Sequence, residues 1–296
     1  MAPSQTNDPG TPPHAGPGPH RPLVGAASAP ALHVMSWNIR RPLPRLLTTP
    51  ADRWDRRAPR LCALLAAERP TVLGAQEVCA GQSEVVRLAL GGHYRCLGRG
   101  RSAGGVGEAC PIFYDARRLE VLDWEQSALS DHPGRPGSVS WGNVVPRVMV
   151  RASFRDRVTA RRFLVVNTHL DPLSARSRRR SARAILAVAA ASALPTVVTG
   201  DLNAGPSSAV VGELMSGGLL ADSWHRARSR GSGEWGTYAA YRAPREDGRR
   251  IDRILVSPAV SVALAAINPL RYGGGWASDH LPVHAVVELD EGGTGR

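Results

Sequence analysis

Apolar and polar residues alternate in short runs along most of the chain, and Gly, Pro, Asn and Asp bound these runs. Runs of this kind are typical of β-strands that line a folded core. They predict strands at residues 32–39, 71–78, 111–114, 147–154, 162–170, 195–202, 251–256 and 282–289. Apolar residues at helical spacing predict helices at 54–68, 82–90, 174–192 and 207–216. Because strands dominate both ends, we expect a mixed α/β domain with much antiparallel pairing.

The two ends of the chain differ in composition from its body. Residues 1–30 hold eight of the 24 prolines, with Gly, Ser, Thr and Asn between them. Such a segment buries too little apolar surface to offset the entropy lost on ordering. We therefore predict a disordered Pro/Gly-rich tail over 1–30 and one domain over 31–290. The last six residues, 291–296, are expected to fray.

The charge of the chain is a weaker indication than its size suggests. The formal net charge is +12 and the isoelectric point is near 10.9, values that usually indicate an anionic partner. All the basic residues are arginine, however, and lysine is absent. A GC-rich genome produces the same bias, so the charge gives little support to nucleic acid as the partner.

Hydrophobic residues make up 43% of the chain, which is enough to fill a core, but no apolar run is long enough to cross a bilayer. A secretory signal is not evident. The four cysteines are irregularly spaced and contain no CxxC pair, so neither a zinc cage nor a disulfide framework is expected. We expect a cytoplasmic protein with no membrane partner and no obligate protein partner.

Polar residues interrupt or follow most of the predicted strands where each begins or ends. They lie in "VMSWNI" (Asn38), "VLGAQEV" (Glu77), "FLVVNTHLD" (Asn167, His169, Asp171), "VVTGDLN" (Asp201, Asn203), "RIDRILVS" (Asp252) and "SDHLPV" (Asp279, His280). Each type has a structural explanation: Asn in a turn or cap, Glu in the first turn of a helix, and a single His hydrogen-bonded in the core. Asp252 lies inside an apolar strand, where a buried carboxylate needs a partner such as a histidine.

Taken together, these residues suit one kind of chemistry. Carboxylate and amide oxygens are the ligands that Mg²⁺ prefers, and Mg²⁺ in proteins commonly works on phosphate. Imidazole and carboxamide groups can hold or protonate phosphate oxygens. The set therefore predicts a hydrolase of phosphoesters that uses Mg²⁺, with Mn²⁺ as a possible substitute.

The ordered series "SWNI", "AQEV", "GEACPIFY", "NTHLD", "TGDLN", "RIDRILVS" and "SDHLPV" resembles the endonuclease/exonuclease/phosphatase superfamily, which includes deoxyribonuclease-like enzymes. The resemblance covers nearly all of 31–290. The stretch "LSDHPGRPGSVSWGNVVPRV" also resembles a compact bacterial branch of that superfamily whose substrate is not settled. The resemblance implies an α/β four-layer sandwich, in which two mixed β-sheets pack face to face with flanking helices.

The resemblance also implies roles for individual residues. Glu77 would be the principal metal carboxylate, and Asn38 and Asp279 would complete the metal shell beside water. Asp201 would align or deprotonate the attacking water. Asn203 would hold the phosphate as charge builds on it.

On the phosphate itself, His280 would make a contact, fixed by Asp252 as its carboxylate partner. His169 would lie on the other side of the phosphate, oriented by Glu108. Arg147 matches an arginine that some members aim at phosphate, although a surface role is an alternative in so arginine-rich a chain.

Two questions stay open at this stage. The substrate is expected to be nucleic acid, a nucleotide or a small phosphorylated molecule, so a nuclease or phosphodiesterase and a phosphatase are both compatible with the motifs. The alternative from another class is a non-catalytic binding scaffold that keeps the fold. Such a scaffold would have no reason to retain all of the proposed catalytic residues.

Overall fold

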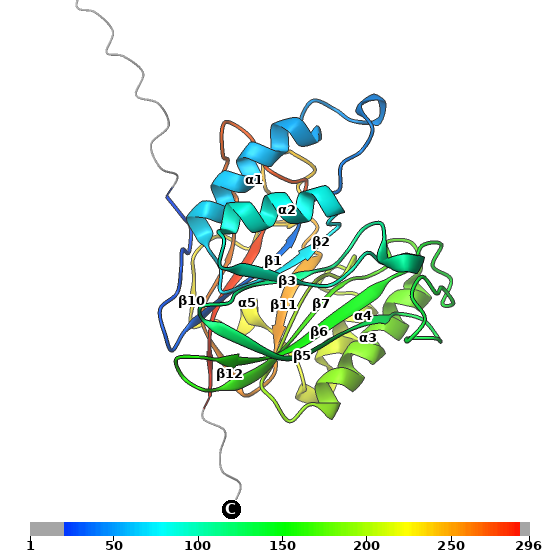
Figure 1. Cartoon of the computed structure of the whole chain (residues 1–296), viewed down its shortest axis with the longest axis vertical. Helices are drawn as coiled ribbons and strands as arrows, with labels where there is room; N and C mark the ends of the chain where they lie inside the picture. The colour runs from blue at the N-terminus through cyan, green and yellow to red at the C-terminus, as the bar shows by residue number, and fades with distance from the viewer. Residues whose placement is uncertain (1–20, 291–296) are drawn as a thin grey trace, which may run out of the picture.

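The computed structural model describes residues 21–290, which form two β-sheets with helices outside them (Figure 1). The strands of the first sheet are β1 (Leu32–Asn38), β2 (Val72–Gln76), β3 (Tyr94–Leu97), β4 (Ile112–Asp115), β10 (Ser229–Arg230), β12 (Val260–Ile267) and β13 (Val283–Leu289). Those of the second are β5 (Leu119–Ala128), β6 (Val148–Asp156), β7 (Arg162–His169), β8 (Thr196–Asp201), β9 (Ala221–Asp222) and β11 (Asp252–Val256).

Helices cover the outer face of each sheet. Two of them, α1 (Trp54–Glu68) and α2 (Ala80–Leu90), pack on the seven-stranded sheet, whose order is β10-β12-β13-β1-β2-β4-β3. The helices α3 (Ala175–Ala191) and α4 (Ala209–Met215) pack on the six-stranded sheet, whose order is β5-β6-β7-β8-β11-β9. The short helix α5 (Ser223–Arg226) and three 3₁₀ turns, Arg45–Leu47, Ala103–Gly105 and Ser216–Gly218, complete the elements. The predicted four-layer α/β sandwich is confirmed.

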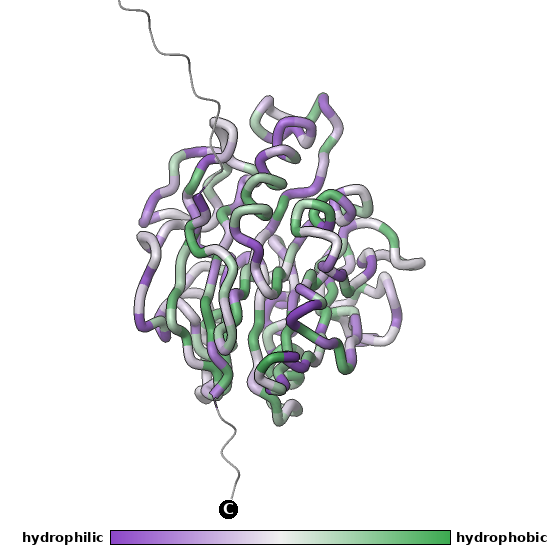
Figure 2. The backbone as a smooth tube through the Cα atoms, turned by 60° about the vertical axis from the view of Figure 1, so that its left-hand side comes forward, coloured by the Kyte–Doolittle hydropathy of each residue, from purple (hydrophilic) through white to green (hydrophobic). Residues whose placement is uncertain are grey.

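The core follows from the alternation of side chains along each strand. In β7, Phe163 and Val165 point between the sheets, while Leu164 and Val166 point toward α3 and α4. Both faces of this strand are buried, which explains its continuous apolar sequence. Figure 2 shows the strands of the two sheets as layers in which hydrophobic stretches recur.

All of the predicted strands and helices form, within a few residues of the expected bounds, but three substantial strands were missed. Strand β5 lies at the edge of its sheet and is largely half-exposed, and a register shift between Val121 and Asp123 breaks its alternation. Strand β12 is rich in alanine and has a similar shift between Val262 and Leu264. Strand β3 has four residues, of which only Tyr94 is buried, so its sequence YRCL has no apolar run like that of β4.

The topology carries the polar strand ends to one place. Strands β1 and β2 are parallel, and so are β7 and β8, so the carboxyl ends of each pair lie together. Strand β11 runs antiparallel to β8 with Asp252 opposite Asp201, which puts its amino end at the same edge. Strand β13 runs antiparallel to β1, so the residues just before it lie beside the end of β1.

A buried polar bridge joins the two sheets directly beneath this edge. The Asn167 Nδ2 donates to the carbonyl oxygen of Ala75 (2.8 Å), and its Oδ1 accepts from Gln76 Nε2 (2.8 Å) and Thr199 Oγ1 (3.0 Å). Gly74 leaves room for this bridge, because a Cβ atom there would lie 2.0 Å from Thr199 Oγ1. Asn167 therefore ties β2 of one sheet to β7 of the other.

The ordered body begins earlier than the sequence predicted. The carboxylate of Glu68, at the end of α1 and fully buried, accepts hydrogen bonds from the backbone N–H groups of Leu23, Val24 and Gly25 at 2.7–3.1 Å. These hydrogen bonds hold residues 23–25 against the end of α1, so the predicted boundary at residue 31 is wrong for this part. Its low apolar content concealed contacts that run through its backbone. The rest of the predicted tail, 1–20, and the predicted frayed end, 291–296, lie outside the described residues.

The space around Gly74 gives a first prediction. Gly74→Ala places a methyl group against Thr199 and Asn167, so we expect it to destabilise the protein by about 1–3 kcal/mol, as overpacking usually does. Gly81→Ala is the matched control, because Gly81 lies in α2 with open space around it and alanine favours a helix. Thermal melting of both variants measures the effect. Equal melting temperatures would contradict the proposed tight packing.

The contacts of Glu68 give a second prediction. Deleting residues 1–30 removes three hydrogen bonds to a buried carboxylate, whereas deleting 1–20 leaves them in place. Hydrogen bonds to charged groups contribute about 1.5–3 kcal/mol each, although water partly replaces those that are lost. We expect the longer deletion to melt at least roughly 5 °C below the shorter one. Coincident melting curves would show that residues 21–30 add nothing to stability.

Candidate active site

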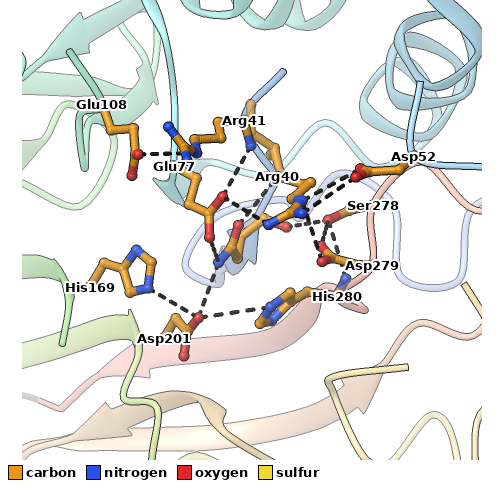
Figure 3. Close-up of polar contacts among 12 residues, drawn as sticks. Arg40, Arg41, Asp52, Glu77, Glu108, His169, Asp201, Ser278, Asp279 and His280 are labelled. Carbon is orange, nitrogen blue, oxygen red and sulfur yellow. Dashed lines mark hydrogen bonds and ion pairs between the residues drawn. The ribbon is translucent and has the colours of Figure 1, made fainter. Parts of the chain in front are cut away.

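Asp201, at the end of β8, lies at the centre of the polar edge with a histidine on either side (Figure 3). Its Oδ2 accepts a hydrogen bond from Asn38 Nδ2 (3.0 Å) and lies 3.4 Å from His169 Nε2 and 3.9 Å from His280 Nε2. Its Oδ1 accepts from the backbone N–H of Asn203 (2.9 Å). Burial and the nearby Asp252 raise the pKa of Asp201, which strengthens it as a base.

His280 is the charged histidine of the site. Its Nδ1 donates to Asp252 Oδ2 at 2.8 Å, and both residues are buried. Burial opposes the charge, but Asp252 outweighs it and raises the pKa of His280 to about 10. Asp252 is fixed in turn, because its backbone N–H donates to Thr237 Oγ1 (3.0 Å). The predicted pairing of Asp252 with His280 is present in the structure.

His169 is in the opposite state. Burial lowers the pKa of His169 to about 4, although Asp201 lies beside it, so the ring is neutral near pH 7. Asn203 Nδ2 lies 3.0 Å from His169 Nε2 and can only donate, so Nε2 accepts and the proton of the ring is on Nδ1. The second hydrogen bond of Asn203 Nδ2 goes to the carbonyl of Leu170 (3.0 Å). In this structure Asn203 orients His169, which was not predicted.

Glu108 was predicted to orient His169, and this contact is not made between the described residues. Glu108 pairs instead with Arg101 at 2.9 Å and Arg41 at 3.3 Å. Two guanidinium groups attract a carboxylate more strongly than a neutral imidazole does. Glu108 lies in the wall of the site, where it holds two arginines in place.

Arg147 is buried in another wall of the site. Its Nε donates to Asp171 Oδ2 (3.4 Å), while its Nη1 is buried with no hydrogen-bond partner among the described residues. Asp171 also accepts from the backbone N–H groups of Leu173 and Ser174, which lead into α3. Asp171 had no predicted role, and it positions Arg147. A buried guanidinium with a free N–H group suits an anionic ligand.

The predicted metal carboxylates, Glu77 and Asp279, line the same cavity as Asp201. Glu77 Oε1 accepts from Asn38 Nδ2 (3.1 Å) and Oε2 accepts from the backbone N–H of Arg41 (3.1 Å). Burial works against the charge of Glu77, but His169 and these hydrogen bonds outweigh it and hold the pKa of Glu77 at about 2. Burial raises the pKa of Asp279, which His280 and Arg40 partly oppose.

The two carboxylates suit a cation, because one cation of the chain already lies between them. The Arg40 guanidinium is 3.9 Å from Glu77 Oε2 and 3.6 Å from Asp279 Oδ2. Asn38 fits the predicted metal shell less well. Its Oδ1 accepts from the backbone N–H of Arg40 (3.0 Å), and its Nδ2 separates the carboxylates of Glu77 and Asp201.

These groups surround a cavity of about 510 Å³. Of the predicted site residues, those that line it are Glu77, Glu108, Arg147, His169, Asp201, Asn203, Asp279 and His280. Asn38 and Asp252 lie behind them and contact Asp201 and His280. Sequence reasoning missed the other lining residues, which include Arg40, Arg41, Arg101, Tyr238 and Arg249. No signal marked these arginines, since arginine is the only basic residue besides histidine in the chain.

Comparison with known proteins identifies the family of the chain. A model of the Endonuclease/Exonuclease/phosphatase family matches residues 35–280. The fold and this match thus place the chain among hydrolases that act on phosphoesters. The chain belongs to the endonuclease/exonuclease/phosphatase family. Among curated proteins, none matches the chain in sequence.

Similar solved structures come from Bacteroides. A family protein of Bacteroides vulgatus is 30% identical with a TM-score of 0.81, covering 88% of this chain and 99% of its own. A family protein of Bacteroides thetaiotaomicron is 27% identical with a TM-score of 0.82, covering 88% and 98%. A mannosyl-6-phosphatase of the same species is 27% identical with a TM-score of 0.80, covering 87% and 100%. None of the described helices is long and apolar enough to cross a membrane.

The His280–Asp252 pair makes stability depend on pH. The pKa of His280 is higher in the folded chain than the value of about 6.5 expected after unfolding. The pair therefore stabilises the fold fully below pH ~6.5, and this contribution is lost as the pH rises toward about 10. We expect the difference in unfolding free energy between the native protein and Asp252→Asn to shrink over that range in urea titrations.

Asp171→Asn is the control, because it also removes a buried carboxylate. The partner of Asp171 is an arginine, a side chain that keeps its charge throughout this pH range. The loss of unfolding free energy in Asp171→Asn should be the same at pH 6.5 and pH 10. A pH-independent difference for Asp252→Asn would contradict the assignment of the charge to His280.

Proposed function

We propose that the protein is a phosphatase that depends on Mg²⁺ or Mn²⁺ and hydrolyses small phosphorylated molecules. The observation that carries the proposal is the pair of histidines in opposite charge states on either side of Asp201. One histidine is a cation held by Asp252, and the other is neutral and held by Asn203. Pairs of titratable groups whose pKa values are pushed apart are typical of acid–base catalysis.

The proposed reaction is attack of water on phosphorus. Asp201, a carboxylate of raised pKa, takes a proton from the water as its oxygen bonds to phosphorus and the ester P–O bond breaks. His280 and Arg147 face the phosphate oxygens and stabilise the charge that builds on them. The leaving alcohol takes its proton from solvent. A divalent cation, when held by Glu77 and Asp279, would supply further positive charge to the phosphate.

Asn203 has a proposed role that differs from the one expected. Its Nδ2 is engaged with His169 and Leu170, so its contribution is to orient His169 and, through its backbone N–H, Asp201. His169 then presents a neutral ring to the phosphate from the side opposite His280. Asn38 keeps the carboxylates of Glu77 and Asp201 apart and supports both.

The size and lining of the cavity favour a phosphatase over a nuclease. A volume of about 510 Å³ suits a sugar phosphate or a molecule of similar size. Apart from Arg40, which pairs with Asp52, the lining arginines are Arg41, Arg101, Arg147 and Arg249, and they suit the two negative charges of a terminal phosphate. The similar structure named a mannosyl-6-phosphatase supports a phosphorylated sugar as the first substrate to test.

The test is release of inorganic phosphate from mannose 6-phosphate and other sugar phosphates, with a single-stranded oligonucleotide as the competing substrate. We expect turnover of a sugar phosphate with Mg²⁺ or Mn²⁺ and its loss in excess chelator. Asp201→Asn should lower turnover by about 10² to 10⁴, the usual scale for general acid–base groups. Glu77→Gln should lower the apparent affinity for metal and be partly rescued by more metal.

Glu84→Gln is the matched control for Glu77→Gln. Glu84 is an exposed carboxylate on α2 that pairs with Arg87, and neither residue lines the cavity. Its activity and metal response should match the native protein. Full activity in excess chelator would refute the metal dependence, and faster cleavage of the oligonucleotide would refute the phosphatase.

A further inference from the structure

Arg40 places a positive charge among three carboxylates at the edge of the site (Figure 3). Its guanidinium contacts Asp52 through Nε (3.4 Å) and Nη2 (3.3 Å). It also lies 3.6 Å from Asp279 and 3.9 Å from Glu77, without the geometry of a hydrogen bond to either. Arg40 is thus hydrogen-bonded to Asp52 and interacts electrostatically with both Glu77 and Asp279.

The backbone of Arg40 is fixed, so only its side chain can respond to a change in the site. The residue has φ +58°, a left-handed conformation that is costly for arginine. Its N–H donates to Asn38 Oδ1 (3.0 Å), and its carbonyl accepts from Arg57 Nη2 (3.1 Å) and Gln82 Nε2 (2.9 Å). The side chain is about one-quarter exposed and lines the cavity. The guanidinium therefore has room to turn at a fixed attachment point.

Asp52 is an equally fixed partner for that side chain. Its Oδ1 accepts a 2.6 Å hydrogen bond from the hydroxyl of Tyr241, and Arg57, fully buried, lies 3.7 Å away. Arg57 also donates to the carbonyls of Ile39 and Ala277, which flank the site residues Asn38 and Asp279. Asp52 is therefore held whether or not the charges of Glu77 and Asp279 are neutralised by something else.

A metal at Glu77 and Asp279 would compete with Arg40 for the same two charges. Two cations that share a pair of carboxylates repel each other. Near a protein surface, the interaction between two unit charges about 4 Å apart is substantial. From these contacts we infer that Arg40 is the built-in counter-ion of the Glu77–Asp279 pair and sets its affinity for the metal, with Asp52 as the carboxylate that retains Arg40 when the metal binds. This inference rests on the metal dependence of the proposed function.

The arrangement has a consequence for the metal-free protein. Without Arg40, the carboxylates of Glu77 and Asp279 would repel each other, and the strand ends that carry them would be destabilised. With Arg40 in place the site keeps its geometry before any metal arrives. The cost is a weaker metal site than two free carboxylates would make.

The test is Mn²⁺ binding in the absence of substrate. Binding is measured by calorimetry and by the electron paramagnetic resonance signal of free Mn²⁺. Arg40→Met removes the charge and keeps most of the side-chain length, so we expect its dissociation constant for Mn²⁺ to fall tenfold or more. Arg40→Lys keeps the charge and should stay within about threefold of the native protein. Asp52→Asn leaves Arg40 with only Glu77 and Asp279 as partners, so the affinity of this variant for Mn²⁺ should fall about threefold.

Arg41→Met is the matched control. Arg41 is the next residue and lines the same cavity, but its side chain pairs with Glu108 and not with the metal carboxylates. Its dissociation constant should stay within about twofold of the native value, which separates a local effect from a general loss of positive charge. Equal gains in affinity for Arg40→Met and Arg41→Met would overturn the inference.

A second readout protects the test against misfolding. We expect Arg40→Met to melt below the native protein without metal, and saturating Mn²⁺ to raise its melting temperature more than that of the native protein. If the native protein binds Mn²⁺ through Glu77 but Arg40→Met binds no more tightly, the inference fails and the metal-dependent function stands. If neither protein binds Mn²⁺, the metal dependence fails and the inference fails with it.

Discussion

The hydrogen bonds of Asn167 set the distance between the two sheets at the point where the site is built. One carboxamide reaches from β7 to the backbone and to a side chain of β2, and Thr199 of β8 joins it from the same side. These groups are buried, so each would be costly to leave without a partner. The bridge holds only while both strands keep their register. The polar chemistry above it depends on that register.

Above the bridge, the site distributes charge by burial and pairing. Asp252 makes a cation of His280, while the equally buried His169 has a neutral amide as its closest partner and stays neutral. Glu77 stays ionised because His169 and the hydrogen bonds to its carboxylate outweigh burial. The same kinds of side chain thus take different protonation states within one cavity. Their neighbours decide the state, and the topology decides the neighbours.

Much of this could be read from the sequence, because strand periodicity and the polar strand ends are local signals. Asp252 inside an apolar strand pointed correctly to a histidine partner, since a buried carboxylate has few alternatives. Glu108 was misassigned because its partners, Arg41 and Arg101, are distant in sequence or hidden in an arginine-rich loop. Arg40 carried no signal of its own in a chain whose basic side chains are nearly all arginine.

The hydrogen bonds to Glu68 could not be foreseen for a different reason. They come from backbone N–H groups at residues 23–25, which any sequence can supply. A proline-rich composition predicts how little apolar surface a segment can bury, but it does not show where its amides donate. Strands β5 and β12 were missed for a related reason, because a shift in register erases the periodicity that a sequence pattern detects.

The proposed catalytic groups divide into two half-sites, one on each sheet. Glu77 and His280 come from strand ends of the first sheet, and His169, Asp201 and Asp252 come from the second. The seam between the sheets therefore runs through the site itself, and a small slide of one sheet over the other would misalign the half proposed to bind metal with the half proposed to activate water. The apolar side chains between the sheets therefore form the core and also keep the two sheets in register with each other. Substitutions deep in that layer could therefore alter the proposed catalysis without touching the cavity.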